Sequence, residues 1–172
     1  MANKKPLTAL NVLTTMDAIQ RRIDSPSIPA NYIVGTKYTE KNANDIEKAI
    51  ERFARIVGFL CERTKTQGRL MQAKYKDTPE GRLTVSKEKF VTSTSRKGSS
   101  DLKLLINSKY ITGEIKFGKD RQSADQKKYQ NDVESNGGTY VIWKTFEDFL
   151  IWYVSNFGRP KIMQQAIDEL KK

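Results

Sequence analysis

Hydrophobic residues near the start of the chain recur at a helical period. Leu10, Leu13 and Ile19 fall on one face of a helix, which predicts an amphipathic helix over residues 7–22. Residues 25–29, Ser-Pro-Ser-Ile-Pro, are expected to end this helix, because proline fixes φ and lacks an amide hydrogen.

A second helical pattern follows a polar segment in which Tyr32–Val34 predicts a short strand. Asn44 and Glu47 have the spacing of a capping box, which predicts a helix over residues 44–57 that ends at Gly58. The buried stripe of this helix is expected to contain Ile46, Ile50, Phe53 and Val57.

Three later segments have the apolar and β-branched content of strands, namely residues 59–63, 102–106 and 110–117. Two turn formers, Asn107 and Ser108, separate the last two segments and predict a β-hairpin.

Helical and strand patterns alternate again after the hairpin. Residues 118–122 are expected to form a loop, and Ser123 and Gln126 form a capping box for a helix that ends before Asn-Gly-Gly at 136–138. The remaining elements expected are a strand over 139–143 and helices over 145–157 and 161–172. This alternation predicts an α/β fold.

The hairpin register brings acidic residues together. If Ile106 faces Lys109 across a two-residue turn, Asp101 lies opposite Glu114, and Lys116 projects from the same face because side chains alternate with period two. Two carboxylates about 4 Å apart repel by about 4 kcal/mol at an effective dielectric constant of about 20. A divalent cation would remove that cost, so the pattern predicts a metal site with a lysine beside it.

Composition limits the chemistry that is available. The chain has 172 residues, which suits one globular domain, and its 31 Lys and Arg against 20 Asp and Glu give a net charge of +11. Such a charge favours nucleic acid as a partner, with an anionic membrane surface as the alternative. The absence of histidine excludes histidine bases and His-ligated zinc, and the single Cys61 excludes an internal disulfide. Hydrolysis would then rest on carboxylates, lysine and a hard metal ion.

Targeting signals are not evident in the sequence. The amino end lacks the continuous apolar core of a signal peptide, and no stretch approaches about 18 apolar residues. We therefore expect a cytoplasmic, intracellular protein without a membrane span.

The acidic residues carry a family resemblance. Asp101 followed by Gly113-Glu114-Ile115-Lys116 resembles the D…(D/E)-x-K signature of the PD-(D/E)XK nuclease superfamily. The segments 121–126 and 137–142, with their glutamine and Gly-Gly turn, are similar to the VRR-NUC and Holliday-junction-resolvase-like branch. Ser100 departs from the pattern, since proline or valine often precedes the aspartate.

The resemblance covers roughly residues 44–150 and implies a fold. The expected core is restriction-endonuclease-like, with a central mixed sheet of four or five strands flanked by helices. Residues 1–43 would then be an N-terminal accessory helix and connector, and residues 44–172 the nuclease domain, with a basic insertion at about 64–98.

The same resemblance implies how the central residues act. Asp101, Glu114 and the backbone carbonyl of Ile115 would hold Mg²⁺ or Mn²⁺, both of which prefer oxygen ligands. Lys116 would position or deprotonate the attacking water, or stabilise developing charge, and the alternative is an ordinary strand lysine paired with a carboxylate.

Two further residues have both a structural and a catalytic interpretation. Gln126 would orient water or a phosphate beside the metal, and the alternative is that it only caps its helix. Glu47 would face the metal site from the first core helix, and the alternative is again a helix cap, with Glu51 one turn later solvated.

The insertion at 64–98 is long, polar and basic, and strands are expected to pair within it around 69–73 and 90–94. Nucleic-acid contact is the favoured interpretation, and a solvated basic loop is the alternative. The residues expected to contact DNA near the site are Arg63, Arg96, Lys97, Lys119 and Arg121.

The sequence thus predicts a Mg²⁺- or Mn²⁺-dependent endodeoxyribonuclease that hydrolyses phosphodiester bonds. Junction or branched DNA is one candidate substrate, and a four-way-junction resolvase would act as a homodimer. The alternatives are a non-catalytic nucleic-acid-binding or structural subunit that retains a nuclease fold, and a basic protein that binds a membrane or an acidic partner. The compact size and the VRR-NUC-like pattern favour a stand-alone enzyme, and a phage or mobile element is one candidate source of it.

Overall fold

The protein is α/β, with a mixed four-stranded sheet whose order is β1–β6–β7–β8. The computed structural model describes residues 6–64, 69–79, 81–91 and 95–172. The strands of the sheet are β1 (Leu60–Arg63), β6 (Leu102–Ile106), β7 (Lys109–Ile115) and β8 (Thr139–Trp143). Only the β7–β8 pair is parallel.

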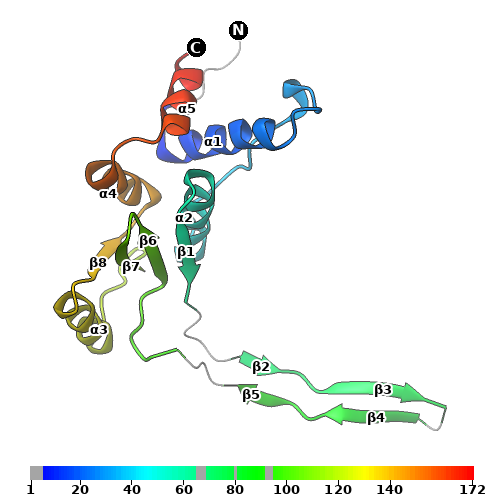
Figure 1. Ribbon diagram of the computed structural model, residues 1–172. Coiled ribbons are helices and arrows are strands. Elements are labelled where there is room, and N and C mark those ends of the chain that lie inside the picture. Colours follow the sequence, from blue (N-terminus) through cyan, green and yellow to red (C-terminus); the bar gives the residue numbers. More distant parts are fainter. Residues whose placement is uncertain (1–5, 65–68, 80, 92–94) are drawn as a thin grey trace.

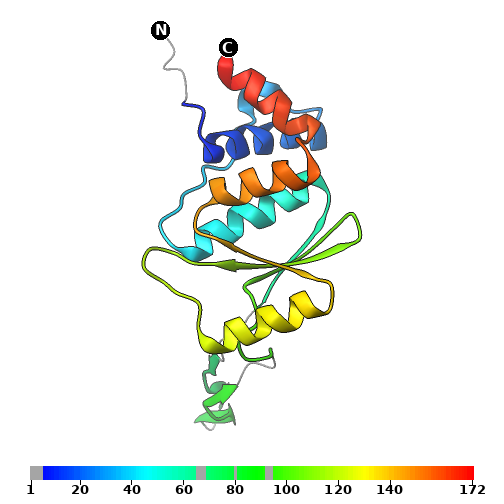
Figure 2. The same cartoon turned by 90° about the vertical axis from the view of Figure 1, so that its left-hand side faces the viewer.

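Helices cover both faces of the sheet (Figure 2). The helix α3 lies on one face, α2 and α4 lie on the other, and α1 and α5 form a further layer beyond them. The helices are α1 (Ala9–Asp24), α2 (Ala43–Val57), α3 (Ala124–Ser135), α4 (Phe146–Phe157) and α5 (Lys161–Lys171). This arrangement confirms the predicted α/β class and mixed sheet.

The predicted hairpin is confirmed together with its register. Asn107 and Ser108 form the turn with positive φ values of 48° and 63°, as a tight two-residue turn requires. Ile106 pairs with Lys109, and the ladder runs back to the pair of Leu102 with Gly113. One step further along the same register lie Asp101 and Glu114.

Two predictions near the start of the chain are wrong. Tyr32–Val34 does not form a strand, because the chain turns after Pro29 into a short 3-10 helix, Ala30–Tyr32. The helix α2 is not opened by a capping box at Asn44. Its N-cap is Asn42, whose side chain accepts the amide N–H of Asp45, so the helix begins one residue before Asn44.

The main hydrophobic core lies between the sheet and helices α1, α2, α4 and α5. Phe53 of α2 is fully buried and makes edge-on contacts with the rings of Phe146, Phe149 and Tyr153 of α4. The predicted stripe of α2 is buried at Ile46, Ile50 and Phe53, while Val57 is half-buried.

The insertion forms a two-stranded arm that projects from the end of β1 (Figure 1). Its inner strands, β2 (Arg69–Met71) and β5 (Lys89–Val91), pair within the segments predicted around 69–73 and 90–94, of which residues 92–94 lie outside the described residues. Its outer strands, β3 (Lys74–Thr78) and β4 (Gly81–Ser86), were not predicted. No helix in the described part of the chain is long and apolar enough to span a membrane.

Candidate active site

Asp101 lies at the junction of three strands. Its Oδ2 accepts the amide N–H of Ile115, at the end of β7, at 2.9 Å. Its backbone carbonyl accepts the amide N–H of Thr64, just after β1, at 2.7 Å. Burial raises the pKa of the Asp101 carboxyl, although the Ile115 amide and the Lys116 charge oppose the shift.

Glu114 projects from β7 and is almost fully buried, with 1% of its surface exposed. Its Oε1 accepts the Lys116 ammonium at 2.8 Å and the Gln126 side-chain amide. Its Oε2 accepts the Tyr140 hydroxyl at 3.3 Å. Burial raises the pKa of Glu114, and the negative charge of Asp101 raises it further, against the hydrogen bond from Lys116.

The position of Glu114 depends on a close approach between β7 and β8. A Cβ atom at Gly113 would lie 2.0 Å from a ring carbon of Trp143, so only glycine fits there. The carbonyl of Trp143 also accepts the amide N–H of Lys116 at 2.9 Å. The buried Trp143 therefore fixes the backbone on both sides of Glu114.

Lys116 is 5% exposed and contacts three oxygen acceptors. Besides Glu114, its ammonium donates to Oε1 of Gln126 at 3.0 Å and to Oδ2 of Asp120 at 3.4 Å. Burial alone would lower the pKa of Lys116, but the hydrogen bond and charge of Glu114 and the charge of Asp120 outweigh it and raise the pKa. Lys116 is therefore a cation here, suited to stabilising negative charge.

Gln126 caps α3 and also contacts two charged residues of the site. Its Oε1 accepts the backbone N–H of Ser123 at 2.9 Å, and the Ser123 hydroxyl accepts the backbone N–H of Gln126, so the capping box is confirmed. The same side chain contacts Glu114 and Lys116. The cap thus anchors the start of α3 to the acidic residue of β7.

Glu47 reaches the same region from α2. Its Oε2 accepts Nε of Arg63 at 2.7 Å, and Arg63 also donates to Asn44 at 2.6 Å. Burial raises the pKa of Glu47 and the charge of Arg63 opposes the shift, while the charges of Asp101 and Glu51 add to it. Arg63, which holds Glu47, pairs in register with Leu102, so Glu47 lies beside the strand that begins after Asp101.

The structure thus brings together Asp101, Glu114, Lys116 and Gln126 at one end of the sheet, and Arg63 holds Glu47 nearby. In the described segments, no three or more His, Cys, Asp and Glu residues are arranged so that they could hold a metal ion. The predicted donor set is smaller, with two carboxylates and the carbonyl of Ile115, and these are the hard oxygens that Mg²⁺ and Mn²⁺ prefer.

The five predicted DNA-contacting residues fall into two groups. Three are already paired with acidic side chains: Arg63 with Glu47, Arg96 with Asp132, and Lys97 with Asp125 at 2.9 Å. The other two, Lys119 and Arg121, are exposed in the loop between β7 and α3 and make no hydrogen bond or ion pair within the described ranges.

Two residues of the site were not predicted. Tyr140 of β8 bonds Glu114, and burial, with the charge of Glu114 adding, raises the pKa of its hydroxyl above its usual value. Asp120 follows Lys116 by four residues within the loop. No period-two signal marks either residue, because the buried residues of β8, Tyr140 and Trp143, are three positions apart and therefore face opposite sides of the sheet.

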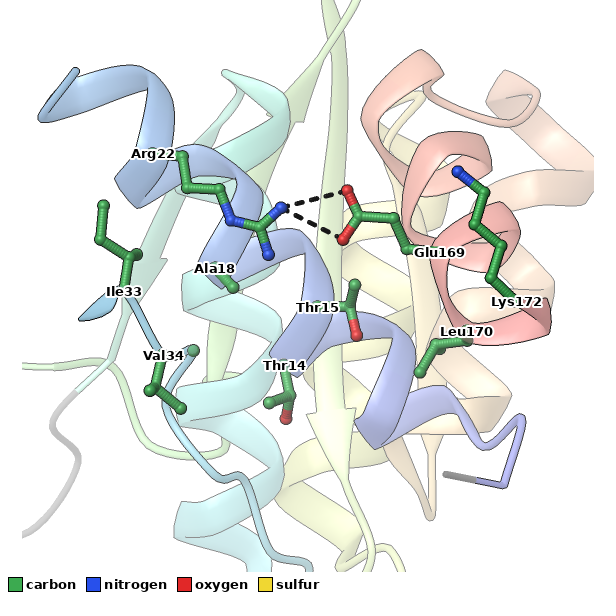
Figure 3. A pocket seen from close by; sticks show the side chains of 10 residues that line it. Thr14, Thr15, Ala18, Arg22, Ile33, Val34, Glu169, Leu170 and Lys172 are labelled. Atoms are coloured by element: carbon green, nitrogen blue, oxygen red, sulfur yellow. Dashed lines mark hydrogen bonds and ion pairs between the residues drawn. The ribbon is translucent and has the colours of Figure 1, made fainter. Parts of the chain in front are cut away.

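Other hollows lie away from these residues. A cavity of about 300 Å³ lies between α1, the segment after it and α5, where Arg22 and Glu169 form an ion pair at 3.2 Å (Figure 3). A cavity of about 690 Å³ lies beside the hairpin turn and the end of α3. It is lined in part by Arg96, whose guanidinium lies 5.8 Å from the centre of the Tyr129 ring.

No family model and no curated protein matches this chain.

Proposed function

We propose that the protein is a Mg²⁺- or Mn²⁺-dependent DNA nuclease with a restriction-endonuclease-like core. One observation carries the proposal. Glu114 is buried, its pKa is raised, it contacts Lys116, and its neighbour Asp101 also has a raised pKa. Acidic residues with perturbed pKa values and a specific charged partner are typical of functional sites.

Asp101, Glu114 and the carbonyl of Ile115 would hold the metal ion. Once bound, such an ion activates a water molecule and neutralises charge on the phosphate. The chain supplies the rest of the chemistry. The Lys116 ammonium stabilises the negative charge that develops on the phosphate oxygens, and Gln126 fixes the orientation of both Glu114 and Lys116.

The charge of the chain supports DNA as the substrate. A net charge of +11 attracts polyanions, and the exposed Lys119 and Arg121 follow directly after the site. We expect DNA affinity to fall linearly with salt on a double-logarithmic plot, since bound counterions are released from the phosphates. Fluorescence anisotropy at several salt concentrations measures this slope, and a flat response would argue against binding through phosphates.

The test of the activity is a cleavage assay on four DNA substrates: a four-way junction, a flap, a single strand and a duplex. Each is incubated with the protein and Mg²⁺, Mn²⁺ or EDTA, beside the Lys116→Ala variant. We expect metal-dependent cleavage of at least one substrate by the natural protein only. DNA binding without cleavage in any metal would instead favour the non-catalytic, DNA-binding alternative.

A further inference from the structure

The outer strands of the arm, β3 and β4, have no core of their own among the residues that the structure describes. In β3 and β4 the side chains of Tyr75, Leu83 and Val85 are 52%, 60% and 63% exposed. Both faces of this two-stranded ribbon are open to solvent across the described residues 74–78 and 81–86. An isolated two-stranded hairpin is only marginally stable in water, so a ribbon of this kind is suited to being covered by a partner.

Charge identifies the partner. Residues 64–98 contain nine Lys and Arg against three Asp and Glu, a net +6 out of the +11 of the whole chain. The structure does not describe Lys65, Glu80 or the side chain of Arg69. More than half of the excess positive charge is thus concentrated in the insertion, which favours a polyanion over a second copy of this basic chain.

The two faces of the outer arm differ. On one face Arg82 lies 4.7 Å from the centre of the Tyr75 ring and 3.4 Å from Asp77, so its charge is already partnered. On the other face Lys76 pairs in register with Leu83. Lys76 makes no hydrogen bond or ion pair with any residue that the structure describes. This second face therefore offers an available cation beside an exposed apolar side chain.

The base of the arm is fixed to the candidate active site. The chain leaves the sheet at Thr64, whose amide N–H donates to the carbonyl of Asp101, where the chain returns. The returning segment is held against α3, because a Cβ atom at Gly98 would lie 2.4 Å from the carbonyl oxygen of Asp125 and Lys97 pairs with the Asp125 carboxylate. A nucleic acid at Asp101 would therefore lie next to the arm.

We propose that the arm inserts into the major groove of duplex DNA that flanks the cleavage position, with the face of Lys76 and Leu83 toward the DNA. A major groove is about 12 Å wide and about 8.5 Å deep, and it admits a two-stranded β-ribbon. The five residues of β3 span about 17 Å, which is enough to follow the groove. This inference rests on the proposed function for the position of the DNA, but its binding claim can be tested without cleavage.

The experiment measures binding of the full chain to a labelled duplex in EDTA, so that no metal-dependent cleavage takes place. One variant replaces residues 74–86 by Asn-Gly, which closes the inner ribbon with a favoured hairpin turn. A second is Lys76→Glu, and its matched control is Lys161→Glu at the exposed start of α5, which changes the net charge equally.

We expect the shortened arm to weaken duplex binding at least tenfold and Lys76→Glu to weaken it about threefold to tenfold, while Lys161→Glu stays within twofold. The loss on single-stranded DNA of the same length should be smaller, because it has no groove. Unchanged duplex affinity of the shortened arm would overturn the proposal. Equal losses of affinity for single-stranded and duplex DNA would also overturn it. The same holds if the natural protein is a dimer and the shortened-arm variant is a monomer that binds DNA as tightly.

The readouts separate this inference from the proposed nuclease activity. If the natural protein cleaves no DNA but the arm variants still lose duplex affinity, the activity fails and the binding claim stands. If the natural protein cleaves DNA and the shortened-arm variant binds duplex as tightly as the natural protein, the activity stands and the binding claim fails.

Discussion

Two buried clusters of charge in this protein have opposite electrostatic character. In the first, the carboxylate of Asp17 on α1 is fully buried. Its Oδ2 accepts the amide N–H of Thr36 at 2.7 Å and Nε of Arg21 at 3.0 Å, and its Oδ1 accepts Nε of Arg52 at 2.7 Å. Burial would raise the pKa of Asp17, but the Thr36 amide and Arg52 outweigh it and lower the pKa.

In the second cluster, burial and mutual repulsion prevail. The pKa values of Glu47, Asp101 and Glu114 are all raised, although Arg63 and Lys116 lie among them. The Asp17 cluster has enough donors for its negative charge and joins α1 to α2 and to the segment between them. The cluster around Glu114 has more negative charge than its donors compensate, which is the property expected of a cation site.

The largest expected effect separates the clusters by activity. Lys116→Ala removes the cation beside Glu114 and should lower the rate of DNA cleavage by about 10³-fold, since transition-state charge loses its stabilisation. Single-turnover cleavage with Mg²⁺ measures it. Asp17→Asn is the matched control from the other cluster, and its folded fraction should cleave at the natural rate. Equal losses in both variants would mean that the two clusters do not differ in role.

The second effect separates the clusters by stability. Asp17→Asn should lower the free energy of unfolding by about 2–4 kcal/mol, because Arg52 and Arg21 lose a buried partner. Glu114→Gln should cost less, about 1–2 kcal/mol, because burial already disfavours the ionised form of Glu114 and Lys116 keeps its contacts with Gln126 and Asp120. Urea unfolding of both variants tests the contrast, and a larger cost for Glu114→Gln would reverse the assignment.

The third effect is stabilisation by metal. At a Mg²⁺ concentration of about ten times Kd, binding to the folded state alone adds about 1.4 kcal/mol to the free energy of unfolding. The natural protein and Asp17→Asn should both gain this stability, and Glu114→Gln should not. Thermal unfolding with and without Mg²⁺ measures the gain. A gain retained in Glu114→Gln would place the cation elsewhere.

The smallest expected effect concerns pH. Because the folded-state pKa of Asp17 lies below its ordinary value of 3.8, its carboxylate stabilises the fold above that pH. This contribution is lost as the pH falls through the lower, folded-state pKa. The stability difference between the natural protein and Asp17→Asn should therefore be constant from neutral pH down to about pH 5. It should shrink only in stronger acid, and a difference that shrank near neutral pH would contradict the account.

Local patterns were sufficient for most of the fold. The turn at Asn107 and Ser108, the cap at Ser123 and the end of α2 at Gly58 each depend on a few neighbouring residues, and the structure confirms all three. The start of α2 was misplaced because Asn42 and Asn44 are both good caps, and the choice depends on tertiary contacts. Asn44 is instead an acceptor for Arg63.

The candidate site shows the same division. Asp101, Glu114 and Lys116 follow from hairpin register, which the sequence encodes locally. Tyr140 and Asp120 reach the site through the packing of β8 and a loop, and the Asp17 cluster joins residues from α1, α2 and the segment between them. Such contacts connect residues that are far apart in the sequence or lie in irregular backbone, so the hydrophobic periodicity of the sequence does not predict them.

Whether Glu114 holds a catalytic metal ion is decided by the rate of DNA cleavage as a function of Mg²⁺ concentration, measured for the natural protein and for Glu114→Gln. We expect a rate that rises with Mg²⁺ and saturates in the natural protein, and no detectable rise in the variant. A variant that responds to Mg²⁺ as the natural protein does would show that the carboxylate of Glu114 does not hold a catalytic metal ion.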